Sequence, residues 1–156
     1  MRILIYTDGA SSGNPGKGGF GVVMKLENSD YYKEFSQGYK LTTNNRMELL
    51  AVIYALKKLK KSNQNIVIYS DSKYVVDCFH KKWYIKWQKN YYNNVKNPDL
   101  WKELLQLVKN HSVEFNWIKG HAGHPENERA DELAVMASKQ ENLLVDTFYE
   151  KSIKNN

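Results

Sequence analysis

The sequence has 156 residues, enough for one domain with a sizeable buried core. Hydrophobic residues make up 42% of the chain and charged residues 26%, which is typical of globular proteins. No apolar run approaches the roughly 18 residues that cross a bilayer, and no leader-like pattern precedes the first predicted strand. We therefore expect a cytoplasmic protein. Its one cysteine, Cys78, is predicted to be a buried thiol and excludes an internal disulfide.

The net charge of +6 is concentrated in one segment, residues 79–97, which contains five lysines and no acidic residue. Aromatic side chains lie between these lysines, and such a mixture suits a phosphate backbone and its sugars. A solvated amphipathic helix with its own small core would have the same composition, so composition alone leaves both interpretations open. The residues concerned are Lys81, Lys82, Trp83, Lys86, Trp87, Lys89 and Lys96.

The N-terminal part of the chain has strand patterns joined by short connections. Strands are predicted over residues 2–6, 20–24 and 31–37, and they indicate an antiparallel meander. The apolar spacing then changes to that of a helix. We expect Asn45 to cap this helix, with Glu48 three residues later as in a capping box.

Strands and helices alternate in the rest of the chain. A short strand over 66–69 ends at Ser70-Asp71, and a helix follows it near Ser72. Asn97-Pro98-Asp99 opens a further helix. A strand over 113–118 and a last helix over 127–139 complete the order. This order predicts a single α/β domain over residues 1–150, with a loosely ordered tail over 151–156. Its five-stranded mixed sheet would combine the antiparallel meander with two parallel strands and carry helices on both faces.

Four acidic residues stand where packing alone would not require them. Asp8 and Asp71 end strands that we expect to be parallel neighbours, Glu48 lies in the first turn of a helix, and Asp131 lies in the last helix. Each alone is explained as a turn, cap or solvated residue. Together at one sheet edge, where ligands of α/β sheets bind, they would repel one another unless a cation compensated. Oxygen ligands suit Mg²⁺ or Mn²⁺ and not Zn²⁺.

Two other patterns are weak. The glycine-rich segment 13–19 is followed by a predicted strand and lacks the Gly-Lys-Ser/Thr context of a nucleotide loop. His121 and His124 have no cysteine beside them, so the sequence does not favour a zinc site.

Four motifs occur in the order of a known family and span residues 1 to about 140. They resemble those of bacterial type 1 ribonuclease H, and the fourth is eighteen residues long. The motifs are Tyr6-Thr7-Asp8-Gly9 with Gly13-Asn14-Pro15-Gly16, Thr42-Thr43-Asn44-Asn45-Arg46-Met47-Glu48, Ser70-Asp71-Ser72-Lys73-Tyr74-Val75, and Trp117 to Ala134. Ser11 and Lys73 depart from the family, where cysteine and glutamine are familiar, so we expect hybrid contacts at these two positions to differ from those of the family.

The resemblance implies an endonuclease that cuts the RNA strand of RNA–DNA hybrids with two metal ions, Mg²⁺ or alternatively Mn²⁺. It implies 5′-phosphate and 3′-hydroxyl products and little sequence preference, and we expect a monomer. Asp8, Glu48, Asp71 and Asp131 match the catalytic metal ligands, and His121 matches a histidine that assists attack or product departure. The implied hybrid contacts are Asn14, Thr43, Asn44 and Asn45, together with Lys81, Lys82, Trp83, Lys86, Trp87 and Lys89 of a basic protrusion over residues 79–97.

Three rival functions have to be weighed. A different metal-dependent nuclease on the same sheet, such as a DNA exonuclease or a transposase-like core, does not explain the long fourth motif or the basic segment. A non-catalytic hybrid-binding module does not need all four acidic positions. A purely structural domain leaves the clustered charges unexplained.

Overall fold

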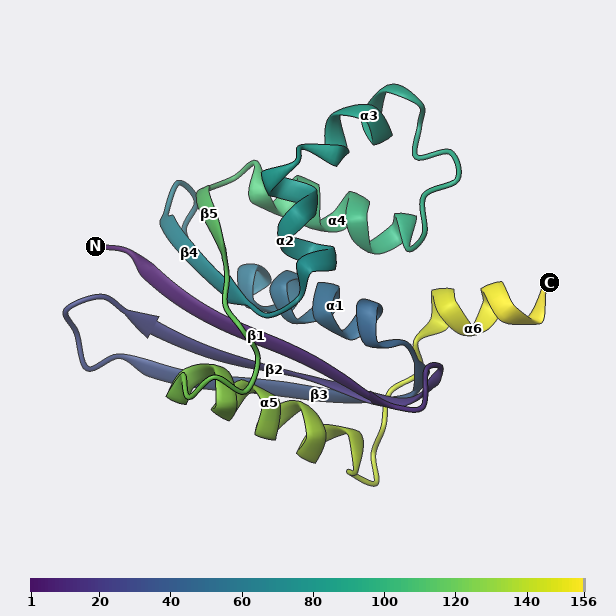
Figure 1. Ribbon diagram of the computed structural model, residues 1–156, viewed down its shortest axis with the longest axis horizontal. Coiled ribbons are helices and arrows are strands. Elements are labelled where there is room, and N and C mark those ends of the chain that lie inside the picture. The colour runs from purple at the N-terminus through teal and green to yellow at the C-terminus, as the bar shows by residue number, and fades with distance from the viewer. Residues whose placement is uncertain (156) are drawn as a thin grey trace.

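The computed structural model describes residues 1–155 and shows a five-stranded sheet with helices on both faces (Figure 1). The order across the sheet is β3-β2-β1-β4-β5. The strands are β1 (Ile3–Ser12), β2 (Gly16–Leu26), β3 (Tyr32–Thr42), β4 (Asn65–Ser70) and β5 (Ser112–Trp117). The helices are α1 (Asn44–Lys57), α2 (Lys73–His80), α3 (Trp83–Lys89), α4 (Pro98–Val108), α5 (Pro125–Ser138) and α6 (Thr147–Lys154).

The strand pairing confirms the predicted fold class. β1, β2 and β3 form an antiparallel meander, whereas β4 pairs in parallel with both β1 and β5. Thr7 of β1 lies opposite Ser70 of β4. The residue that follows Thr7 and the residue that follows Ser70 are both aspartates, so Asp8 and Asp71 lie side by side at the end of this pairing.

The main core lies between the sheet and the helices on one face, where α1 is the most deeply buried. Ile5 of β1, Met47 of α1 and Trp101 of α4 are completely inaccessible to solvent. Because Met47 and Leu49 both face this core, the residue between them is carried into the interior as well. That residue is Glu48.

On the opposite face α5 lies very close to β2 and β3 (Figure 1). A Cβ atom on Gly21 would lie 2.2 Å from the carbonyl oxygen of Ala130, and one on Gly38 would lie 2.1 Å from that of Ala137. Only glycine therefore permits this approach of helix to sheet. The approach places Asp131, which follows Ala130, beside the edge that carries Asp8.

The start of α1 differs from the prediction. Thr43 and not Asn45 is the N-cap, since Thr43 has an extended backbone and its hydroxyl accepts a hydrogen bond from the backbone nitrogen of Arg46. Asn45 lies one residue inside the helix. Glu48 is buried and turns toward the sheet instead of closing a capping box.

The basic segment is not one continuous helix. The chain leaves α2, passes Lys82 with a φ of +56°, forms the short α3, and continues through residues 90–97 with further positive φ angles. Trp87 of α3 packs on Trp101 of α4, with ring centroids 5.0 Å apart. The segment therefore does have a small core of its own, while its lysines remain on the surface.

The end of the described chain contains the helix α6. Residues 151–154, which begin the predicted loose tail, belong to α6, and Asn156 lies outside the described residues. Asp146, just before α6, is buried and accepts two hydrogen bonds from the guanidinium of Arg46. Within residues 1–155 no helix is both long enough and apolar enough to cross a membrane.

Candidate active site and metal centre

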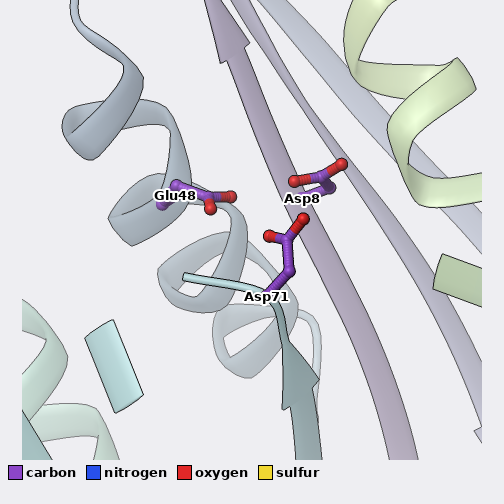
Figure 2. Close-up of side chains that lie close together, drawn as sticks. All are labelled: Asp8, Glu48 and Asp71. Atoms are coloured by element: carbon purple, nitrogen blue, oxygen red, sulfur yellow. The ribbon is translucent and has the colours of Figure 1, made fainter. Parts of the chain in front are cut away.

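Three carboxylates from three different elements converge at the end of the β1–β4 pairing (Figure 2). Asp8 comes from β1, Glu48 from α1 and Asp71 from the residue after β4. Each offers an oxygen, and these oxygens all lie within 4.8 Å of one another. The predicted meeting of these three residues is therefore seen in the structure.

Burial sets the electrostatics of this group. Asp8 is 5% exposed and Glu48 4% exposed. Loss of hydration raises the pKa of Asp8 to about 8, and the neighbouring carboxyls of Asp71 and Asp131 add to the shift. Burial and the charges of Asp8 and Asp71 likewise hold the pKa of Glu48 well above its usual value. Without a cation, Asp8 and Glu48 therefore tend to hold protons near neutral pH, where free carboxyls are already ionised.

Asp131 and His121 line the same open cavity, which has a volume of about 510 Å³. Asp131 reaches it from α5, whereas His121 lies in the loop between β5 and α5. His121 adopts a left-handed backbone conformation with a φ of +57°, which is uncommon for a residue other than glycine. Backbone conformations of this kind persist only where the surrounding structure holds them, and they are frequent at functional sites.

The donor atoms fit a hard divalent cation. All are carboxylate oxygens, which suit Mg²⁺ or Mn²⁺. One of them, Oε1 of Glu48, is buried and has no hydrogen-bond partner among the described residues. A buried oxygen without a partner is costly, and a cation at this point would both satisfy the oxygen and relieve the repulsion.

Comparison with known proteins identifies the family. The family model for RNase H matches residues 1–139. A ribonuclease H of Desulforamulus reducens is 56% identical over 150 residues, covering 93% of this chain and 92% of that protein. A ribonuclease H of Rippkaea orientalis is 51% identical over 154 residues, covering 96% and 93%.

The chain belongs to the RNase H family.

Solved structures agree with the RNase H assignment. The crystal structure of LC9-RNase H1, described as a type 1 RNase H with the type 2 active-site motif, has a TM-score of 0.75 and 33% identity, covering 96% of this chain and 79% of that one. LC11-RNase H1, crystallised in complex with an RNA/DNA hybrid, has a TM-score of 0.64 and 29% identity, covering 86% and 95%. The predicted family and the predicted enzyme class are thus confirmed.

The predicted nucleic-acid contacts divide into two groups in this RNase H fold. Asn44 and Asn45 line the carboxylate cavity. Asn14, in the turn between β1 and β2, accepts a hydrogen bond from the backbone nitrogen of Asn44 at 3.1 Å. Thr43 lies next to them, and its hydroxyl caps α1. These residues form a polar rim on one side of the cavity.

The second group lies away from the cavity. Lys86 and Lys89 are in α3, but Lys81 and Lys82 precede it, so the four lysines do not share a single helical face. Lys81 pairs with Asp77 at 3.6 Å, and its ammonium lies 5.6 Å from the ring centroid of Trp83. Trp83 is at the surface, whereas Trp87 is held against α4.

Sequence reasoning assigned no contact to three residues that shape the site, although it noted Lys73 as a departure from the family. Gly9 lets β1 approach α1, because a Cβ on it would lie 2.5 Å from the backbone nitrogen of Glu48. Lys73 lines the cavity, and Trp117 donates a hydrogen bond from Nε1 to the carbonyl oxygen of Asp71 at 3.0 Å. All three lie within the quoted motifs, but only the fold reveals what they contact.

Cys78 takes no part in this site. It is completely buried, as predicted, and burial raises the pKa of its thiol to about 12. A thiol in that state is a poor nucleophile at neutral pH.

Proposed function

We propose that this protein is an endonuclease that hydrolyses the RNA strand of RNA–DNA hybrids and leaves 5′-phosphate and 3′-hydroxyl ends. The observation that carries the proposal is the convergence of Asp8, Glu48 and Asp71 in an open cavity of an RNase H fold. The hybrid-bound crystal structure of LC11-RNase H1 supports the substrate class. We assign catalysis to residues 1–150, with residues 79–97 as a basic protrusion. The cytoplasmic location and the monomeric state stay predictions.

Asp8, Glu48, Asp71 and Asp131 would hold Mg²⁺, or alternatively Mn²⁺, as two ions when substrate is bound. When bound, such ions supply the positive charge that acidifies the attacking water and stabilises the leaving 3′-oxygen. The carboxylates contribute by being held in place: two come from a rigid sheet edge, and one is fixed by the backbone contact between Gly9 and Glu48. This rigidity orients the scissile phosphate.

His121 handles a proton in the proposed reaction. Its imidazole lies on the rim of the carboxylate cavity and can take a proton from the attacking water or give one to the departing 3′-oxygen. A neutral imidazole has one ring nitrogen that donates a proton and one that accepts, so it can do either. The loop position places His121 beside the carboxylates while leaving it outside their cluster.

Asn14, Asn44 and Asn45 would select the strand to be cut. Their amide groups both donate and accept hydrogen bonds, so they can bind the 2′-hydroxyls that line the minor groove and that DNA lacks. This recognition reads no base, which accounts for the small sequence preference that we propose. The 2′-hydroxyl marks the strand and does not attack the phosphate.

Lys81, Lys82, Lys86 and Lys89 would bind the phosphate backbone, with Trp83 beside them. Their surface position and the scarcity of acidic partners favour this role: of the four, only Lys81 pairs with an acidic group in the described chain, and that pair is 3.6 Å long. Trp87 supports the protrusion from inside, since its ring packs on Trp101.

The test is a comparison of four 5′-labelled substrates of one sequence, with Mg²⁺ and with a chelator. We expect internal cleavage of the RNA strand of the hybrid, with 5′-phosphate and 3′-hydroxyl ends, and none of duplex DNA, duplex RNA or single-stranded RNA. A hybrid with one central ribonucleotide replaced by its deoxy form should resist cleavage at that linkage. Cleavage of duplex DNA would favour a different nuclease, and tight hybrid binding without cleavage would favour a binding module.

A further inference from the structure

Lys73 and Trp117 form a cationic site on the rim of the carboxylate cavity. Lys73 is the first residue of α2 and lies two residues after Asp71. Its ammonium nitrogen is 4.8 Å from the ring centroid of Trp117, the last residue of β5. The same indole donates its N–H to the carbonyl oxygen of Asp71. One aromatic ring therefore connects the backbone of a proposed metal ligand to a positive charge.

This lysine does not stabilise the fold. It is exposed, and among residues 1–155 no acidic oxygen lies within 4.0 Å of its nitrogen. A cation at the first residue of a helix is opposed by the helix dipole. The contact with an exposed tryptophan is weak and does no more than offset the cost that the helix dipole imposes. A substrate-binding role explains the position better than a structural one.

The chemistry of the cavity indicates what Lys73 binds. Within the described chain it is the only lysine or arginine that lines the cavity, whose lining also includes the carboxylates Asp8 and Asp71. The backbone of the cut strand carries one negative charge at every linkage, and a lysine ammonium suits a phosphate as a point charge. The Lys73 nitrogen lies over the Trp117 ring, and no carboxylate oxygen of the described chain lies within 4.0 Å of it.

We propose that Lys73, held over Trp117, binds a non-bridging oxygen of a phosphate adjacent to the scissile one, on the RNA strand. This contact sets the register of the cut strand over the carboxylates. The inference rests on the proposed hybrid cleavage and adds a specificity-determining residue to it. Asn44 and Asn45, which line the same cavity, would bind sugars while Lys73 binds the backbone.

The first experiment compares Lys73→Gln and Lys73→Arg with the wild-type protein, using KM, kcat and their salt dependence on an RNA–DNA hybrid. Lys58→Gln is the matched control, because Lys58 lies 4.9 Å from the ring centroid of Tyr54 at the far end of α1. We expect Lys73→Gln to raise KM several-fold and to reduce the slope of log affinity against log salt by about one unit. Lys73→Arg should retain most of the wild-type slope, and Lys58→Gln should change neither quantity.

The second experiment locates the phosphate. Single linkages around one cleavage site are made as 2′-deoxy methylphosphonates, which are uncharged, and each is compared with the same linkage as a 2′-deoxy phosphodiester. At one adjacent linkage, loss of charge should raise KM for the wild type but not for Lys73→Gln. Equal effects on both proteins at every linkage would overturn the proposal.

The outcomes separate this inference from the proposed function. If the wild type does not cleave hybrid, the proposed function fails. If the wild type cleaves but Lys73→Gln keeps its KM and salt slope, only the role of Lys73 fails. A changed Mg²⁺ requirement with unchanged KM and slope would assign Lys73 to the metal site and would also overturn the proposal. Circular dichroism of each variant checks folding.

Discussion

The backbone of Glu48 lies directly against Gly9: a Cβ on Gly9 would be 2.5 Å from the Glu48 nitrogen and 2.7 Å from the Met47 carbonyl carbon. β1 and α1 therefore touch backbone to backbone beside the carboxylate cluster. Any side chain at position 9 would push the strand and the helix apart. The meeting of Asp8 with Glu48 thus depends on Gly9, which has a hydrogen atom where every other residue has a side chain.

The metal-free protein should lose stability as pH rises from 7 to 8.5. Asp8 has a pKa of about 8 in the folded protein and near 3.9 when unfolded. In this range the folded state therefore binds more protons than the unfolded state, and unfolding becomes easier as the pH increases. Below this range His111, whose pKa burial lowers, acts with the opposite sign.

Urea unfolding in a chelator at several pH values measures this dependence. Between pH 7 and 8.5 the unfolding free energy of Asp8→Asn should change less with pH than that of the wild type. Mg²⁺ should stabilise the wild type most near pH 8.5. Identical pH profiles for the two proteins would contradict the raised pKa of Asp8.

Arg46 should be far more important for stability than Arg129. Its guanidinium is 2% exposed and donates to Asp99 and to Asp146, both at 2.7 Å in the closest contacts. Replacement by methionine leaves the buried Asp146 without its partner and should cost about 3–5 kcal/mol of unfolding free energy. Arg129 also has two acidic partners but is 36% exposed, so Arg129→Met should cost much less, as exposed ion pairs contribute little. Equal losses of unfolding free energy for the two variants, measured by urea unfolding, would contradict this prediction.

His121→Ala should reduce the cleavage rate by about 10²-fold, in the range expected for a lost proton-transfer group. Its affinity for Mg²⁺, measured by calorimetry, should remain that of the wild type, because the proposed ligands are all carboxylate oxygens, which suit Mg²⁺. A large loss of Mg²⁺ binding would instead make His121 a metal ligand.

Replacing Lys81, Lys82, Lys86 and Lys89 with alanine should weaken hybrid binding and leave the maximal rate within several-fold. If these lysines neutralise two to four phosphates, the salt slope should flatten by about two to four units. A quadruple alanine variant of Lys57, Lys58, Lys60 and Lys61, at the end of α1, carries the same change of charge and is the control. An unaltered slope in the folded protrusion variant, or the same flattening in the control, would mean that the protrusion lysines are solvated surface.

The sequence was sufficient for the parts of the site that local rules determine. Asp8 lies in β1 and Asp71 follows β4, and a helical crossover makes these two strands parallel, so the proximity of the two residues could be predicted. The N-cap of α1 could not be predicted reliably, because Thr43 and Asn45 are both good caps. Only the backbone of the folded chain decides between them.

Other features depend on contacts between distant segments. α6 follows Asp146, whose pairing with Arg46 joins residues 100 positions apart. The break before α3 depends on the positive φ of Lys82, which no residue pattern signals. The contact between Lys73 and Trp117 likewise joins the start of α2 to the end of β5.

The central claim is that the carboxylate cluster serves chemistry at the expense of stability, and Asp71→Asn tests it most directly. In one preparation, hybrid cleavage at saturating Mg²⁺ and the melting temperature in a chelator are measured for the variant and the wild type. Because the substitution removes a negative charge beside Asp8 and Glu48, cleavage should be almost abolished while the metal-free melting temperature rises. Cleavage within about tenfold of the wild type, or a lower melting temperature, would contradict the account.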